Sequence, residues 1–365
     1  MVGVQGNERI SLYEKAKRKR RRWIAVAMLV AVNALWGLSF PIMKSLNLQM
    51  EQFFGLEAEA VPSSLSLAFT SGMIGMRFVV SLAMLFIFCP NLVCGASSAE
   101  WRAGALVGLL FYVGLVLQVM GLATIPASRS GFLTSLTAVF TPIFSAIVFR
   151  KSISTNVVVG VAIALLGVSI LTGLIVIDTR GLGVAPDSLS KWTIGDTLTT
   201  LGAILFTGQL LLVDYFGTRM NSTAITPGMF LAVSLGAVMT FAALHTSSLT
   251  SLPMHSAHAL LSWRTLYLSP TFIGIILFLA LFCSVLAFMG MNTYQPHVSA
   301  VHASIIYSCE PVFASGWALF LPEILGTITN KIGYPNEIIS LPLILGGVLV
   351  LLANIVALRP SKANQ

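Results

Sequence analysis

The sequence predicts an all-α integral membrane protein whose ten transmembrane helices form two inverted five-helix repeats. Its composition favours membrane insertion, because 56% of the 365 residues are hydrophobic and only 9% are charged, against roughly 25% charged residues in a soluble domain. Ten apolar segments approach the length of about 20 residues that a helix needs to cross a bilayer. In addition, several residues recur at a constant offset of 169 positions.

The first predicted span, 24–43, follows a basic segment at 15–22. Basic residues are retained on the cytoplasmic side of a membrane, so this segment is expected to hold the N-terminus there. No small-residue cleavage site follows the apolar stretch, which indicates an anchor rather than a removable signal peptide. The net charge of +8 is therefore interpreted as a topology signal near anionic headgroups and not as a nucleic-acid-binding surface.

The remaining spans are predicted from apolar length. They are 68–89, 103–120, 131–149 and 157–177 in the first half, and 197–215, 229–244, 272–291, 303–321 and 338–358 in the second half. The segments 44–67, 245–268 and 322–337 are expected to lie outside the bilayer. Since the number of spans is even, the C-terminus returns to the cytoplasmic side.

An internal repeat relates the two halves of the chain. Met120, Gly121, Thr124, Ser130, Pro142 and Phe144 recur as Met289, Gly290, Thr293, Ser299, Pro311 and Phe313. We divide the chain into a basic cytoplasmic tail (1–23), a first repeat (24–177), a polar linker (178–193), a second repeat (194–358) and a C-terminal cytoplasmic tail (359–365). Five spans per repeat is an odd number, so the second copy must cross the membrane in the opposite direction. Inverted repeats of this kind are typical of secondary transporters, which bind their ligand between the copies near the bilayer midplane.

Ionisable residues are rare inside the predicted spans, and only Arg77 and Glu310 are clearly buried there. A charge at the centre of a membrane helix costs about 2.5 to 3.5 kcal/mol, so each is a candidate functional residue. Glu310 either binds a cationic group or a coupling proton, or it stabilises a helix that Pro311 interrupts. Arg77 either receives an anionic group through its guanidinium fork or pairs with carbonyl groups or Glu310 to hold the bundle together.

Further polar side chains are expected to line a cavity between the repeats. Ser130, Thr134, Thr137 and Thr141 are spaced four, three and four residues apart, which places their hydroxyls on one face of a helix. At the offset of 169, Thr141 corresponds to Glu310. The remaining candidate substrate-binding residues are Trp36, Tyr112, Gln118, Gln209, Asn292, Tyr294 and Tyr307.

A series of short motifs follows the predicted spans in a characteristic order. They are Asn33–Phe40 (NALWGLSF), Gly75–Phe78 (GMRF), Ala127–Thr134 (ASRSGFLT) with the later Pro142, Ile194–Asp196 (IGD) and Glu310–Ala314 (EPVFA). In this order the motifs resemble the EamA-like family of the drug/metabolite transporter superfamily. The resemblance covers residues 24–358 and implies a ten-helix fold with inverted repeats, and export of amino acids or other metabolites as the usual activity.

We therefore expect a secondary active transporter that moves a small polar or amphipathic metabolite, such as an amino acid, by alternating access. There is no nucleotide-binding motif, nucleophile elbow or paired-carboxylate pattern, and the histidines form no ligand cluster. The sequence thus predicts no enzyme activity, no cofactor and no metal. Expected partners are a small-molecule substrate, the lipid bilayer and, as an option, a coupling proton. The expected location is the inner or plasma membrane of the cell. A membrane-embedded enzyme and a non-transporting receptor or scaffold remain as alternatives.

Overall fold

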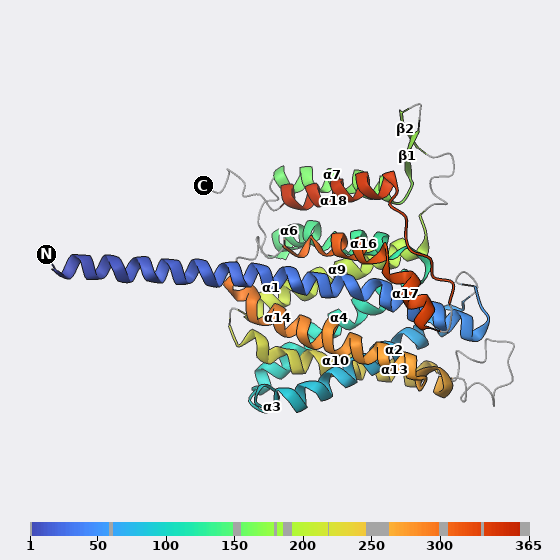
Figure 1. Ribbon diagram of the computed structural model, residues 1–365, viewed down its shortest axis with the longest axis horizontal. Coiled ribbons are helices and arrows are strands. Elements are labelled where there is room, and N and C mark those ends of the chain that lie inside the picture. Colours follow the sequence, from blue (N-terminus) through green and yellow to red (C-terminus); the bar gives the residue numbers. More distant parts are fainter. Residues whose placement is uncertain are drawn as a thin grey trace.

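A computed structural model describes residues 2–57, 61–148, 155–178, 181–184, 192–217, 219–245, 263–298, 306–329 and 332–357. Most of the described chain is helical, and the long helices lie side by side along one direction (Figure 1). Several sequence-based expectations lie outside the described residues: most of the linker, the C-terminal tail and the repeat position Ser299.

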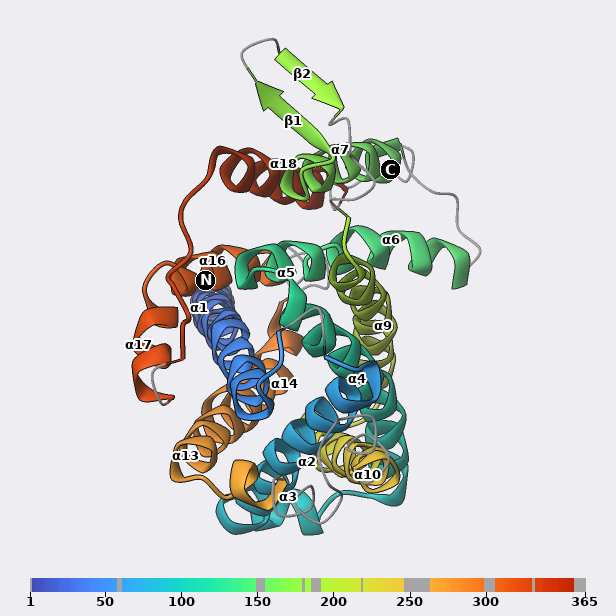
Figure 2. The same ribbon diagram turned by 90° about the vertical axis from the view of Figure 1, so that its right-hand side faces the viewer.

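The first half consists of helices followed by a short hairpin. Its elements are α1 (Val2–Phe54), α2 (Ser63–Phe88), α3 (Pro90–Cys94), α4 (Ser98–Thr124), α5 (Ala127–Thr134), α6 (Thr137–Val148), α7 (Thr155–Leu171), β1 (Ile175–Asp178) and β2 (Gly181–Val184). The two strands pair antiparallel, with Ile175 opposite Val184. They project from one end of the molecule beside α7 and α18 (Figure 2).

The second half contains more interruptions. Its elements are α9 (Ile194–Gly217), η2 (Ser222–Ile225), α10 (Thr226–Leu244), α13 (Pro270–Phe278), η3 (Leu279–Leu286), α14 (Ala287–Tyr294), η4 (Gln295–His297), α16 (Glu310–Ala318), α17 (Leu321–Ile328) and α18 (Leu341–Ala357). The segment η3 is a π-helix that continues α13 directly into α14. Helices α16 and α17 are bent by 58° at their junction.

The described helices support a multi-pass membrane protein. Six of them are long and apolar enough to cross a bilayer, and a seventh span results if the bent pair α16 and α17 is counted as one. Helices α7 and α18 are apolar but shorter. The number of ten spans therefore stays a prediction.

Helix boundaries differ from the sequence-based expectation at several places. The predicted span 131–149 is divided into α5 and α6. Between them, the backbone N–H groups of Leu136 and Ala138 donate hydrogen bonds to the carbonyls three residues earlier, and not to those four residues earlier as in an α-helix. The predicted span 157–177 ends at Leu171, since Gly173 adopts a positive φ of 78° that terminates the helix. The segments 44–67 and 322–337 are not plain loops, because α1 continues to Phe54 and α17 forms a helical turn at Leu321–Ile328.

The closest helix pairs join the two halves of the chain. Helix α4 packs on α9, α2 on α10, α7 on α18, α5 on α16, and α1 on α14 and α16. Glycines allow some of these approaches: a Cβ added to Gly121 in α4 would lie 2.6 Å from the carbonyl oxygen of Gly195 in α9, and one on Gly346 in α18 would lie 2.8 Å from that of Gly167 in α7. Small residues let backbones approach closely where dispersion is the main packing force.

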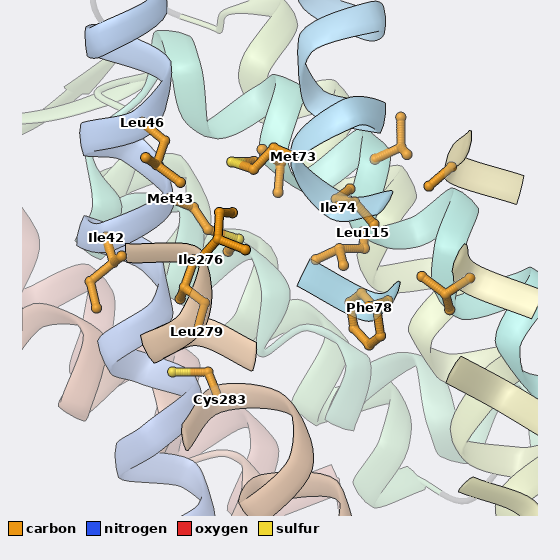
Figure 3. Packing of buried hydrophobic residues seen from close by; sticks show 14 of the residues in the cluster. Ile42, Met43, Leu46, Met73, Ile74, Phe78, Leu115, Ile276, Leu279 and Cys283 are labelled. Carbon is orange, nitrogen blue, oxygen red and sulfur yellow. The ribbon is translucent and has the colours of Figure 1, made fainter. Parts of the chain in front are cut away.

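The main core lies where α1, α2, α4 and the α13–η3–α14 segment meet. Its fully buried side chains include Leu46, Met73 and Phe78. Figure 3 shows part of this core, with Ile276 and Leu279 beside Met43 of α1. A second, smaller core joins α5, α6, α7 and α18. In Figure 2, α7 and α18 lie above α5 and α6, at one side of the bundle. Helices of both groups contribute residues to the cavity described below.

Candidate functional site

A cavity opens between helices of both halves and contains about 930 Å³ of space free of protein atoms, its open side included. The first half contributes α1, α2, α4, α5 and α6, and the second half contributes α9, α14 and α16. Its lining residues are Trp36, Ser39, Phe40, Arg77, Phe111, Leu115, Gln118, Thr134, Ser135, Thr137, Ala138, Phe206, Gln209, Leu210, Phe288, Met291, Tyr307, Ser308 and Glu310.

Glu310 supplies the only carboxylate among these lining residues. It begins α16, where the positive end of the helix dipole favours a negative charge. Pro311 follows it and fixes the first turn without needing a backbone donor. Within the described part of the chain, no residue donates a hydrogen bond to the Glu310 carboxylate or forms an ion pair with it. A negative group of this kind is available for a cation or a proton.

Arg77 supplies the cationic group of the cavity, and it is only 4% exposed. Its Nε donates to Ser284 Oγ at 2.7 Å, and one terminal nitrogen donates to the Cys283 carbonyl at 3.0 Å. The other terminal nitrogen lies 3.6 Å from Met43 Sδ. Among the described residues, Arg77 thus contacts one carbonyl, one hydroxyl and one thioether, and no contact with Glu310 is present there.

Amides and hydroxyls form the uncharged polar part of the lining. Gln118 Nε2 donates to Thr134 Oγ1 at 2.8 Å. The Thr137 hydroxyl of α6 donates to the Thr134 carbonyl at the end of α5 and is 3.2 Å from the Ala203 carbonyl of α9. Gln209 is 8% exposed and lines the cavity from α9 as well. These uncharged groups can donate hydrogen bonds to a polar ligand or accept hydrogen bonds from it.

Aromatic rings form an apolar part of the lining. Trp36 packs against Phe288 and Tyr307 with ring centroids 5.4 and 5.8 Å apart. Phe111 packs against Phe206 at 5.6 Å and against Phe288 at 5.1 Å. The cavity therefore offers an apolar surface and a few polar groups, which is the usual arrangement of a small-molecule site.

The structure divides the sequence-predicted site residues into two groups. Those that line the cavity are Trp36, Arg77, Gln118, Thr134, Thr137, Gln209, Tyr307 and Glu310. Tyr112, Ser130, Thr141, Asn292 and Tyr294 are not among the lining residues. Tyr112 donates to Thr240 at 2.8 Å and Asn292 to Thr226 at 2.6 Å, so both connect helices.

The four hydroxyl residues predicted to share one helix face, Ser130, Thr134, Thr137 and Thr141, do not all line the cavity. Because the helix is interrupted between α5 and α6, only Thr134 and Thr137 next to the interruption line the cavity. Thr141 donates to the Thr137 carbonyl at 2.7 Å, within its own helix. Thr141 and Glu310 are equivalent in sequence, yet only Glu310 reaches the cavity.

Sequence reasoning missed a group of charged residues at the end of the bundle that carries the α4–α5 turn. Glu337 accepts hydrogen bonds from the Ala127 backbone at 2.7 Å and from the Ser128 hydroxyl. Lys44 donates to the Ile125 carbonyl, and Glu51 in the same helix is only 6% exposed. The expected loop at 44–67 concealed the spacing of Lys44 and Glu51, which are two helical turns apart on one face.

At the same end, Arg129 and Asp196 form an ion pair. Arg129 Nε donates to Asp196 Oδ1 at 2.7 Å, and Asp196 has no exposed surface. Both residues lie in motifs noted in the sequence, Ala127–Thr134 and Ile194–Asp196, but the sequence did not indicate that the two side chains meet. The pair joins α5 of the first half to α9 of the second.

Comparison with known proteins finds similarity to one transporter family in the first half of the chain. Residues 23–173 match the model of the EamA-like transporter family. Over these residues the match agrees with the resemblance that the sequence motifs indicated. An uncharacterised transporter of Archaeoglobus fulgidus is 24% identical to this chain over 336 residues, which cover 92% of the chain and 86% of the relative. A solved structure entitled "Crystal structure of protein" covers 91% of this chain and 96% of its own, with 17% identity and a TM-score of 0.49. The EamA-like match and the named relative support a membrane transporter.

Proposed function

We propose that this EamA-like protein is a secondary active transporter that exports or exchanges a small polar or amphipathic metabolite by alternating access. The observation that carries the proposal is the cavity between the halves, in which Glu310 has no partner among the described residues. An amino acid or a related compound suits the lining, because it combines a cationic group for Glu310 with an apolar part for the aromatic rings.

The proposal includes two inverted repeats, 24–177 and 194–358, joined by the linker 178–193. The family match at 23–173 closely follows the first of these ranges. Equivalent residues also make equivalent contacts: Gly121 in α4 packs on α9, the first helix of the second half, and its repeat partner Gly290 in α14 lies against Val32 of α1. Such reciprocal packing is what a two-fold relation between the halves requires.

The proposed roles follow from the surroundings of each group. Glu310 binds the cationic group of the substrate or carries the coupling proton, because it is the acidic group of the cavity. Gln118, Thr134 and Gln209 orient polar atoms, and Trp36, Phe111 and Phe288 hold the apolar part. The membrane is the inner or plasma membrane, with both termini in the cytoplasm.

The test begins with ligand identification. A ligand that binds only the folded state raises its melting temperature, so purified protein is screened by thermal shift against a panel of zwitterionic amino acids, amines and organic acids. Hits are then measured as radiolabelled flux in proteoliposomes. The absence of flux for every stabilising compound in wild-type vesicles would refute the transporter proposal.

Glu310→Gln is expected to lower flux at limiting substrate by about tenfold or more, because a hydrogen bond to a charged group contributes about 1.5 to 3 kcal/mol. The matched control is Glu323→Gln, since Glu323 is exposed in α17 and lies outside the cavity. Equal flux in Glu310→Gln and wild type would remove Glu310 from the mechanism.

A further inference from the structure

The cavity wall depends on an unusual backbone segment outside the cavity itself. Helix α14, which supplies Phe288 and Met291 to the lining, is preceded by the π-helix η3 over Leu279–Leu286. π-helical turns are rare in proteins and occur frequently at functional sites. The residues that hold this segment in place are therefore of interest for the transport reaction.

Three side-chain contacts from α2 reach η3. Arg77 donates to Ser284 Oγ at 2.7 Å and to the Cys283 carbonyl at 3.0 Å, and Ser81 Oγ lies 3.3 Å from the Ala280 carbonyl. All of these residues are buried. A backbone carbonyl can accept from outside its helix when it tilts away from the axis, and the wide π-turn provides that tilt. The contacts therefore favour the π-helical form of the segment.

The register of η3 determines which side chains of α14 face the cavity. A π-turn closes through hydrogen bonds five residues apart and so holds an extra residue compared with an α-turn. One residue corresponds to about 100° of rotation in an α-helix. Conversion of η3 to an α-helix would rotate α14 relative to α13 by about this angle and turn Phe288 and Met291 away from the cavity.

Contacts at both ends of the segment accompany the present register, and those of α14 would be lost if η3 became α-helical and α14 rotated. On the α13 side, Phe272 packs against Phe69 of α2 with ring centroids 6.1 Å apart. On the α14 side, Asn292 donates to Thr226 Oγ1, and its carbonyl accepts from Ser222 Oγ. Figure 3 shows Cys283 of η3 directed toward α1, beside Leu279 and Ile42.

We infer that Arg77 is a positioning residue: by binding Ser284 and the Cys283 carbonyl it holds η3 as a π-helix, and thereby keeps Phe288 and Met291 of α14 in the cavity wall. Its guanidinium acts on the substrate through these two side chains. The inference deepens the proposed function, on which its transport measurement depends. Its structural part is independent of any substrate.

The structural part is tested with the full-length protein in detergent and with a native reporter. Cys283 has no exposed surface, so loosening of η3 exposes its thiol to N-ethylmaleimide, and mass spectrometry of peptides separates it from the other cysteines. The main variant is Ser284→Ala, because Ser284 binds Arg77 and does not line the cavity. Arg77→Lys tests the guanidinium itself while it keeps the charge. The control is Ser234→Ala in α10, a buried serine that bonds only within its own helix.

Ser284→Ala and Arg77→Lys are expected to label Cys283, and to exchange the amide hydrogens of Leu279–Leu286, about tenfold faster or more than wild type, since a hydrogen bond to a charged group is lost. Ser234→Ala is expected to match wild type. Unchanged labelling and exchange in both folded variants would show that Arg77 does not hold the segment.

The positioning role is tested by the kinetics of flux for a substrate found in the screen. Ser284→Ala is expected to raise KM severalfold, because the cavity wall is displaced although no lining residue is changed. An unchanged KM together with faster labelling would overturn the positioning role. Failure of the proposed function would appear differently, as absent flux in the wild type, and would leave the labelling result intact.

Discussion

At the scale of single residues, buried charges fall into those with partners and those without. Asp196 is enclosed by Arg129 and by the backbone and hydroxyl of Thr193, whereas Glu310 faces the cavity without a partner in the described residues. Burying a charge is costly unless it is paired and hydrogen-bonded. We therefore assign Asp196 to stability and Glu310 to function, and this difference in role can be measured.

Asp196→Asn is expected to lower the stability of the protein by about 3 kcal/mol, because removing one partner of a buried ion pair leaves the other charge uncompensated. The measurement is thermal unfolding of purified protein, with Asp214→Asn as the control. Asp214 lies in the same helix but is exposed. If both variants unfold at the same temperature, the Arg129–Asp196 pair does not stabilise the fold.

At the scale of helices, close approach depends on glycine. Gly121→Ala is expected to destabilise the contact between α4 and α9 by about 1 to 3 kcal/mol, because the added methyl group would lie 2.6 Å from the Gly195 carbonyl oxygen. Gly274→Ala in α13 is the control, since nothing lies within 4 Å of the added atom. That change is expected to be neutral or to stabilise the helix by up to about 1 kcal/mol. Comparable unfolding of the two variants would contradict the proposed contact.

The sequence was sufficient for the location of most helices and insufficient for their interruptions. Apolar length predicted α2, α4, α9 and α10 closely, because the thickness of the bilayer sets it. The interruption between α5 and α6 and the π-helix η3 depend on tertiary contacts, such as that of Arg77 with Ser284, which join residues far apart in the chain. Propensity and periodicity carry no information on such contacts.

The candidate site was likewise predictable only in part, because its residues could be found in the sequence but their partners could not. Polar residues in the middle of apolar segments, such as Arg77, Gln118 and Glu310, were predictable because lipid penalises them. Their partners were not: Asn292 and Tyr112 are polar in the same way, yet they bond to Thr226 and Thr240 of α10 and leave the cavity to others. Composition indicates that a buried polar group needs a partner, whereas only the fold determines which one.

At the scale of the whole molecule, the inverted arrangement makes a prediction about topology. With five spans in each repeat, a tag inserted in the linker 178–193 is expected on the side opposite to tags at both termini. The accessibility of these tags to a membrane-impermeant reagent in intact cells measures their side of the membrane. Permeabilised cells, in which the reagent reaches every tag, provide the control. A linker on the same side as the termini would contradict the inverted repeats.

The packing of first-half helices on second-half helices has a consequence for biosynthesis. When α7 leaves the ribosome, the surfaces that α4, α2 and α7 later present to α9, α10 and α18 are still uncovered. The first half therefore reaches its native packing only as the helices of the second half are inserted. Until then the glycine faces at Gly121 and Gly167 are not covered by their native neighbours in α9 and α18.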